Sequence, residues 1–209
     1  MSERIFDLFK KIESTSSSTE PISFIIAGLG NPGSKYTFTR HNAGFLALSY
    51  ISQKENFSIN RSKFSSLCTD VTFGGKRCLF MLPQTFMNNS GQALREAADF
   101  YKISPENILV IHDDISLDVG VMRIRRKGSD GGQKGMRSII EHFGTDAFPR
   151  IKIGVGKKPH PEMELADWVL SSFPDGEKET LFSLFGNLHE ATKLIVEAKI
   201  DEAMNKYSR

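Results

Sequence analysis

The sequence predicts a single three-layer α/β/α domain, with a mixed, mostly parallel sheet and helices on both of its faces. Short apolar runs that end in glycine or polar residues are typical of buried strands, and they alternate along the chain with segments of helical periodicity. Gly74–Gly75 separates two strand-like segments, which adds an antiparallel hairpin to the parallel units. With 209 residues, 39% of them hydrophobic, the chain can form one large core.

Residues 1–22 differ from the rest and are expected to form a flexible N-terminal extension to a domain over residues 23–209. Met1–Ile12 has the apolar spacing of a short amphipathic helix, and residues 13–20 form a Ser/Thr-rich linker without an apolar side chain. Charged residues interrupt the apolar positions of the first twelve residues, which argues against a signal peptide.

The expected elements follow in chain order. Continuous apolar runs predict buried strands, and the alternation over Gly120–Arg126 predicts a half-buried one. The expected strands are Phe24–Ala27, Lys63–Phe73, Lys76–Leu82, Ile108–Ile111, Gly120–Arg126 and Arg150–Val155. The expected helices are Asn42–Lys54, a helix to Tyr101 with Ser90 as its N-cap, Gln133–Phe143 and a mainly helical segment over Asp175–Tyr207.

The charge distribution is uneven although the net charge is only +2. Residues 120–160 carry ten basic and three acidic groups, and residues 161–209 carry five basic and ten acidic groups. A polyanion would be attracted to the first segment, so we expect the acidic segment to face away from such a ligand.

Other features bound the compartment and the ligands. No run approaches the roughly 20 apolar residues of a membrane span. Cys68 and Cys78 give neither a disulfide framework nor the spacing of a zinc site. We therefore expect a cytoplasmic protein with reduced cysteines, no membrane contact and no bound metal.

Gly28–Gly33 has the G-x-G-x-x-G spacing of a dinucleotide-binding loop, but its context differs. Such a loop needs a helix that begins at its second glycine, whereas Pro32 removes an N–H donor and residues 34–40 lack a helical pattern. No acidic residue ends a second strand about 20 residues on. We expect a turn that presents Asn31 to a ligand, and a nicotinamide-dependent oxidoreductase is the third-ranked hypothesis.

Several polar residues follow a predicted strand or precede a predicted helix. His41 lies at a helix start, where the helix dipole favours the neutral imidazole. Asp113 and Asp114 close a buried strand and could orient a histidine, hold a divalent metal or cap a loop. The chain has no P-loop motif, which excludes a nucleotide hydrolase in which these carboxylates would hold the metal. Asn88 could donate to a carbonyl, hold a water or cap a helix.

Residues 123–135 combine a basic strand, a glycine-rich loop and a helix start. Backbone N–H groups in this loop, with Arg125 and Lys134, suit a phosphate group. A basic strand face alone is more often a solvated surface, so the combination is the informative feature.

Four segments, taken in order, resemble the bacterial peptidyl-tRNA hydrolase family. They are G-L-G-N-P-G with R-H-N-A-G (Gly28–Gly44), P-Q-T-F-M-N-N-S-G (Pro83–Gly91), H-D-D (His112–Asp114) and G-S-D-G-G-Q-K-G (Gly128–Gly135). The resemblance runs from about Phe24 to the last residue. It implies a monomeric enzyme without a cofactor that cleaves the ester between a peptide and the terminal ribose of tRNA.

The resemblance also implies roles for single residues. His41 would be the general base, Asp113 would hold its imidazole, and Asn31 would contact the peptide near the ester. The other implied contacts are Asn88 with the peptide main chain or the water, Tyr36 and Phe86 with tRNA or peptide, and Arg125 and Lys152 with the 5′ phosphate of tRNA.

One pair of residues departs from the family pattern. Many members have His-Asn where this chain has Gln133-Lys134, and the Lys134 ammonium can donate but cannot accept a hydrogen bond. The second hypothesis is therefore a non-catalytic RNA-binding relative of the same fold. The presence of both His41 and Asp113 opposes it.

Overall fold

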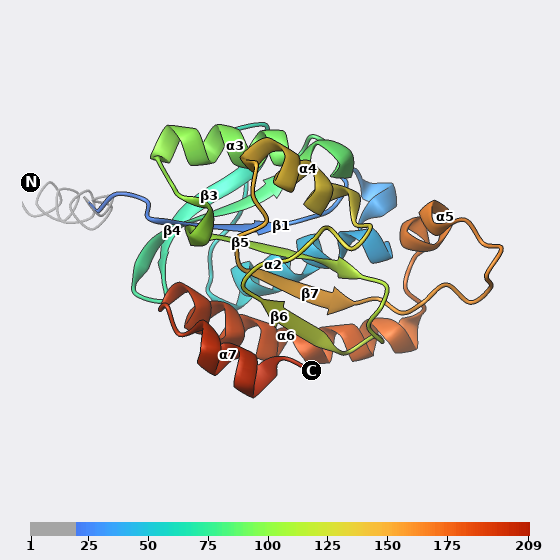
Figure 1. Cartoon of the computed structure of the whole chain (residues 1–209). Helices are drawn as coiled ribbons and strands as arrows, with labels where there is room; N and C mark the ends of the chain where they lie inside the picture. Colours follow the sequence, from blue (N-terminus) through green and yellow to red (C-terminus); the bar gives the residue numbers. More distant parts are fainter. Residues whose placement is uncertain (1–19) are drawn as a thin grey trace, which may run out of the picture.

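Seven strands form one mixed sheet in a computed structural model that describes residues 20–209 (Figure 1). Their spatial order is β2-β3-β4-β1-β5-β7-β6. The four central strands β4, β1, β5 and β7 are parallel, and β3 and β6 run against their neighbours. The strands are β1 Phe24–Gly28, β2 Arg61–Lys63, β3 Ser66–Phe73, β4 Lys76–Pro83, β5 Ile108–Asp114, β6 Met122–Arg125 and β7 Arg150–Gly154.

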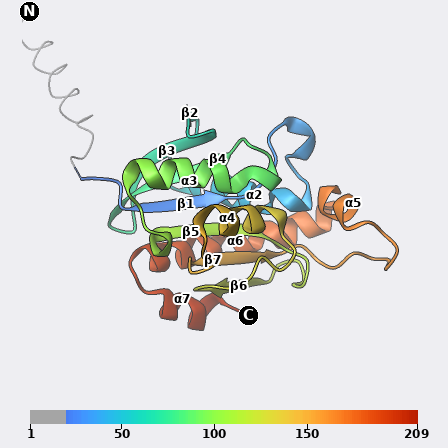
Figure 2. The same ribbon diagram turned by 45° about the horizontal axis from the view of Figure 1, so that its top comes forward.

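Helices cover both faces of this sheet, which confirms the predicted three layers (Figures 1 and 2). One face packs against α2, α6 and α7, and the other packs against α3 and α4. Within β1, Ile26 packs toward the first layer, whereas Ile25 and Ala27 pack toward the second. The helices are α2 Ala43–Lys54, α3 Ser90–Tyr101, α4 Lys134–Phe143, α5 Leu165–Leu170, α6 Asp175–Val196 and α7 Ile200–Tyr207.

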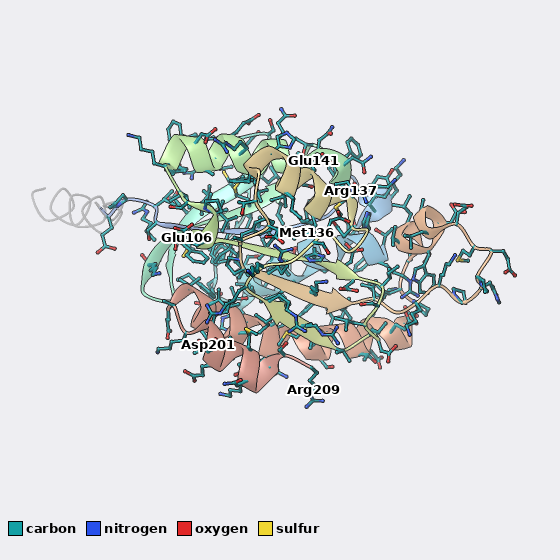
Figure 3. The ribbon with its side chains drawn as sticks, in the orientation of Figure 1. Glu106, Met136, Arg137, Glu141, Asp201 and Arg209 are labelled. Carbon is teal, nitrogen blue, oxygen red and sulfur yellow. The ribbon has the colours of Figure 1, made fainter. Side chains whose placement is uncertain are left out.

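The α4 helix illustrates how the sequence pattern orients a helix on the sheet. Met136 is fully buried beneath it, whereas Arg137 and Glu141 are exposed on its outer surface (Figure 3). Its N-cap is Gln133, whose side-chain oxygen accepts a hydrogen bond from the Met136 N–H at 2.7 Å. The predicted helix at this position is thus confirmed, with Gln133 just outside it.

Several predicted boundaries were wrong in detail. The single strand expected over Lys63–Phe73 is two strands, because Phe64 and Ser65 have positive φ angles of 53° and 49° and reverse the chain. Ser90 is the first residue of α3 and not its N-cap, and its hydroxyl donates to the Met87 carbonyl. The C-terminal helical segment divides into α6 and α7, and the short helix α5 was not predicted. The predicted N-terminal extension lies outside the described residues except for its last three.

The α2 helix crosses β1 at two glycines. A Cβ atom at Gly28 would lie 2.4 Å from the Gly44 carbonyl oxygen, and one at Gly44 would lie 2.3 Å from the Ile111 carbonyl oxygen. The Leu29 N–H donates to that Ile111 carbonyl, and the Phe45 N–H donates to the Leu29 carbonyl. The glycines of the G-x-G-x-x-G-like segment therefore permit close packing of helix and strand. A three-residue 3₁₀ turn follows them in place of a phosphate-binding helix, which contradicts the dinucleotide interpretation.

The acidic C-terminal segment is divided between two places. Helices α6 and α7 lie on the face opposite α4 (Figure 1). Asp201 of α7 pairs with Arg126 after β6 at 2.5 Å. Glu164, just before α5, instead lines the cleft described below, so the expectation fails for this residue.

The structure bears on the state of the two cysteines and on membrane-spanning helices. Cys68 and Cys78 are buried and unpaired, and burial raises the pKa of the Cys78 thiol to about 12. Such a thiol is chemically inert. No helix within residues 20–209 is long and apolar enough to span a bilayer.

A pair of glycine substitutions tests the packing of α3 against α4. A Cβ atom at Gly91 would lie 2.2 Å from the Ser138 carbonyl oxygen in the α4 backbone. We expect Gly91→Ala to lower the free energy of unfolding by about 1–3 kcal/mol in urea denaturation. The control is Gly186→Ala in α6, where the nearest atom, the Tyr50 hydroxyl, is 3.7 Å away. That variant should be neutral or stabilised by up to about 1 kcal/mol, and equal effects would contradict the close contact.

Candidate active site

A cleft of about 570 Å³ lies beyond the carboxyl ends of β1 and β5, where open α/β sheets bind ligands. The α4 N-terminus forms one wall and α5, which projects at the end of the molecule, forms another (Figure 1). Six of the nine predicted site residues line it: Asn31, His41, Phe86, Asn88, Asp113 and Lys134. The other three, Tyr36, Arg125 and Lys152, are not among the lining residues.

The centre of the cleft is a buried chain of three polar side chains. His41 Nδ1 lies 2.9 Å from Asp113 Oδ2, and Gln133 Nε2 donates to Asp113 Oδ1 at 3.0 Å. Asp113 is only 2% exposed, and each of its carboxylate oxygens has a partner within the protein, as buried polar atoms require. Because a carboxylate only accepts, the proton of neutral His41 is on Nδ1, which leaves a lone pair on Nε2. This arrangement suits removal of a proton from a water or hydroxyl group.

Sequence position explains how these side chains meet. His41 belongs to the 3₁₀ turn Arg40–Asn42 that begins α2, and Asp113 is near the end of β5. The α2 helix starts at the glycine contact with β1, next to β5 in the sheet. Gln133 comes from the loop before α4 on the other layer. The carboxyl end of β5 therefore lies between both layers and receives one donor from each.

Asn31 is held rigidly beside this chain. The Asn42 side chain accepts from the Asn31 N–H at 2.9 Å and donates to the Asn31 carbonyl at 3.0 Å. The Asn31 side-chain oxygen accepts from the Met87 N–H at 2.9 Å, which fixes the orientation of the amide. Its NH₂ group is therefore the part of Asn31 best suited to donate to a ligand.

A second histidine, His112, lines the cleft but differs from His41 in its environment. Burial lowers the pKa of His112 to about 4, against the raising effect of the neighbouring Asp113. Its Nδ1 lies 2.7 Å from the Asp113 carbonyl oxygen, and its Nε2 is enclosed without a protein partner. His112 is thus neutral near pH 7 and has no nitrogen exposed to the cleft, whereas His41 is the histidine paired with the carboxylate.

Two apolar surfaces flank the polar centre. Phe86 is 54% exposed and has a positive φ of 57°, an uncommon conformation for a bulky residue and often a mark of functional constraint. Leu165 and Leu170 of α5 are 39% and 41% exposed, and Val169 lies between them. Large apolar side chains exposed on cleft walls suit a ligand with apolar groups or flat rings.

The predicted phosphate-binding cations differ in whether they are already paired with an acidic side chain and in how exposed they are. Lys152 on β7 forms a 2.9 Å ion pair with Asp114, although burial of Asp114 opposes ionisation. Hydrogen bonds from Ser116 and Lys152 outweigh that burial and lower the pKa of the Asp114 carboxyl. Arg125 at the end of β6 and Lys134 at the α4 N-terminus are exposed. Exposed cations meet an anion at a smaller desolvation cost than Lys152 does.

Tyr36 lies outside the cleft lining, in the 3₁₀ turn Ser34–Tyr36. It is half-buried, and the Lys35 ammonium lies 4.8 Å from its ring centroid. Among residues 20–209, no group of three or more His, Cys, Asp or Glu side chains is arranged to share a metal ion.

Sequence reasoning missed Gln133 and Asn42 as site residues. Of the pair Gln133-Lys134, which differs from the family pattern, only Lys134 was predicted as a site residue. In the structure Gln133 contacts Asp113, and Lys134 is exposed. The position of Gln133 could have indicated its role, because an amide directly before an amphipathic helix is suited to cap that helix, and capping holds its side chain in place. Asn42 had no signal of its own beyond its proximity to His41.

The role of Asn42 can be tested through stability alone. Asn42→Ala leaves the buried Asn31 N–H without its acceptor, and we expect the free energy of unfolding to fall by about 1–3 kcal/mol. Asn88→Ala, at an exposed amide of the same cleft, should stay within about 0.5 kcal/mol of wild type. Denaturant unfolding of both variants is the measurement, and an unaffected Asn42→Ala would contradict the clamp.

Comparisons with known proteins show which family this chain is similar to. The family model described as peptidyl-tRNA hydrolase matches residues 25–209. The chain is 49% identical over 184 residues to a peptidyl-tRNA hydrolase of Caldicellulosiruptor bescii, covering 88% of this chain and 96% of that protein. It is 46% identical to one of Clostridium novyi, covering 88% and 97%. The crystal structure of peptidyl-tRNA hydrolase from Acinetobacter baumannii is similar with a TM-score of 0.83 at 34% identity, covering 92% and 99%. The chain therefore belongs to the peptidyl-tRNA hydrolase family.

Proposed function

We propose that this protein hydrolyses the ester between a peptide and the terminal ribose of tRNA, with His41 as the general base. The observation that carries the proposal is the His41–Asp113–Gln133 chain of hydrogen bonds within the cleft. An ester is reactive enough for attack by a water that a histidine deprotonates. The family membership favours this catalytic function over the RNA-binding alternative.

In the proposed mechanism, His41 Nε2 takes a proton from the attacking water. The Asp113 carboxylate keeps the other proton on Nδ1 and stabilises the imidazolium that forms. Gln133 donates to the second Asp113 oxygen and so fixes the carboxylate plane relative to the imidazole. When the ester breaks, His41 can return the proton to the ribose oxygen that leaves.

The remaining groups of the cleft would hold the substrate. The Asn31 NH₂ group and the exposed Asn88 amide are suited to donate to carbonyl oxygens of the peptide near the ester. Phe86 and the leucines of α5 suit the apolar parts of the peptide and the terminal base. Asn31, His41, Asp113 and Gln133 all belong to one chain, so the proposed chemistry requires no residue from a second copy.

We propose that the tRNA backbone lies along the basic surface next to the cleft. Lys134 lines the cleft at the α4 N-terminus, where the helix dipole also favours an anion. Arg125 is exposed on β6 and is the stronger candidate for a more distant phosphate, because Lys152 is already paired with Asp114. A tRNA substrate implies that the enzyme works in the cytoplasm.

Removal of the proposed base should abolish most turnover. We expect His41→Ala to lower kcat for release of N-acetyl-aminoacyl groups from tRNA by about 10²–10⁴-fold, because general base catalysis contributes that much. Binding of tRNA should change little. No ester release by wild-type protein would overturn the proposed function. Near-wild-type turnover by His41→Ala would remove only His41 from the mechanism.

Removal of a phosphate contact should act on binding and on its salt dependence. We expect Arg125→Ala to weaken binding of different tRNAs similarly and to reduce the slope of log K against log salt concentration by about 0.7–0.9. Arg95→Ala removes an equal charge from α3, where Arg95 pairs with Asp99, and serves as the control. Binding titrations at several salt concentrations measure both. A slope in Arg125→Ala equal to that of the control would exclude this contact.

A further inference from the structure

The residue before His41, Arg40, is a buried arginine with an ion pair, further hydrogen bonds and a contact with an aromatic ring. Arg40 is 2% exposed, and its guanidinium is surrounded by groups from four segments. Its Nη1 donates to the Val155 carbonyl at 2.8 Å and to Glu177 Oε2 at 2.6 Å, and its Nε donates to Ser171 Oγ at 3.3 Å. Its carbon Cζ lies 3.7 Å from the Trp168 ring centroid.

These partners surround the α5 wall of the cleft. Trp168 belongs to α5, Ser171 directly follows it, and Glu177 is in the first turn of α6. The Arg40 N–H also donates to the Ser171 carbonyl at 3.0 Å, and Thr39 pairs with Ser172 as an isolated antiparallel bridge. The 3₁₀ turn that carries His41 and the segment that carries α5 are thus joined through main chain and side chain.

The opposite side of α5 is the one that faces the cleft. Leu165, Val169 and Leu170 line it, whereas Trp168 is half-buried against Arg40 and donates through Nε1 to the Gly156 carbonyl at 2.9 Å. With only six residues, α5 is too short to be a stable helix by itself. Its position relative to His41 therefore depends on the contacts made by Trp168 and by the residues that follow it.

We propose that Arg40 is a positioning residue that fixes the α5 wall of the cleft relative to His41. Its planar guanidinium stacks on Trp168 and donates in three directions at once, which an ammonium group cannot reproduce. Glu177 compensates its charge within the buried contact. The substrate held against α5 and the base that acts on its ester are therefore set at a defined distance by this side chain together with the main-chain pairing next to it. The kinetic consequence rests on the proposed hydrolysis, but the structural anchor does not.

The chain contains a single tryptophan, so tryptophan fluorescence reports on the surroundings of Trp168, which include the Arg40 contact. We expect Arg40→Lys to shift the emission to longer wavelength and to increase quenching by acrylamide, because Trp168 becomes more exposed to water. In steady-state cleavage of N-acetyl-aminoacyl-tRNA, KM should rise on the order of tenfold with a smaller change in kcat, because the loosened wall mainly weakens substrate binding. A merely structural role would lower the active fraction and leave KM unchanged.

Two further variants keep the test decisive. Glu177→Gln removes the charge partner and keeps the shape, and it should change quenching and KM in the same direction by a smaller factor. Arg95→Lys, at an exposed pair on α3, should match wild type in every measurement.

Wild-type quenching and KM in folded Arg40→Lys would overturn the proposal. A fall in kcat at unchanged quenching would also overturn it, since the effect would then lie within the His41 turn. If wild-type protein released no ester, the proposed hydrolysis would fail, and the quenching data would still decide whether Arg40 anchors α5.

Discussion

The active-site geometry depends on the close approach of α2 to β1 at Gly28 and Gly44. Any side chain at either position would meet backbone atoms within 2.4 Å, so the two elements can approach only where both residues lack a Cβ. This contact brings the start of α2 to the carboxyl ends of β1 and β5. Asn31 follows the first strand, His41 precedes the helix, and Asp113 lies near the end of the second strand. Backbone packing thus brings Asp113 next to Asn31 and His41, although Asp113 is 72 residues from His41 in sequence.

The sequence patterns predicted well those features that follow from burial of a whole element. β1 is apolar over its first four residues because helices cover both faces of the sheet, and such a run is recognisable without a structure. The amphipathic pattern of α4 and the two-glycine turn between β3 and β4 were also sufficient. Within the cleft, Asn31 and Asp113 were predicted because polar side chains that follow a buried strand lie where such sheets bind ligands. His41 was predicted from its position at a helix start and from the family resemblance.

The features that were missed depend on contacts between distant segments. Helix α5 has six residues and is held by Arg40 and by pairing of the residues after it, so no local periodicity marks it. The turn at Phe64 and Ser65 uses positive φ angles that a Phe-Ser sequence does not suggest. The contact of Gln133 with Asp113 was missed for a similar reason. Which of two neighbouring polar residues faces a carboxylate is decided by where the helix begins, and sequence patterns fix that point only to within a residue or two.

The uneven charge of the surface has a consequence for how a polyanion approaches. Helices α6 and α7 carry six acidic and three basic residues on one side of the sheet, whereas Lys134 and Arg137 of α4 are exposed on the other, so a net charge of only +2 masks an uneven surface. An uneven charge distribution turns the molecule during diffusion even where the net attraction is weak, so encounters are biased toward those in which the exposed cations lead. Because screening limits such fields to about 8 Å at physiological ionic strength, this bias acts only in the last stage of approach. It favours fast association without the tight hold that a uniformly basic protein would exert on a product that must leave.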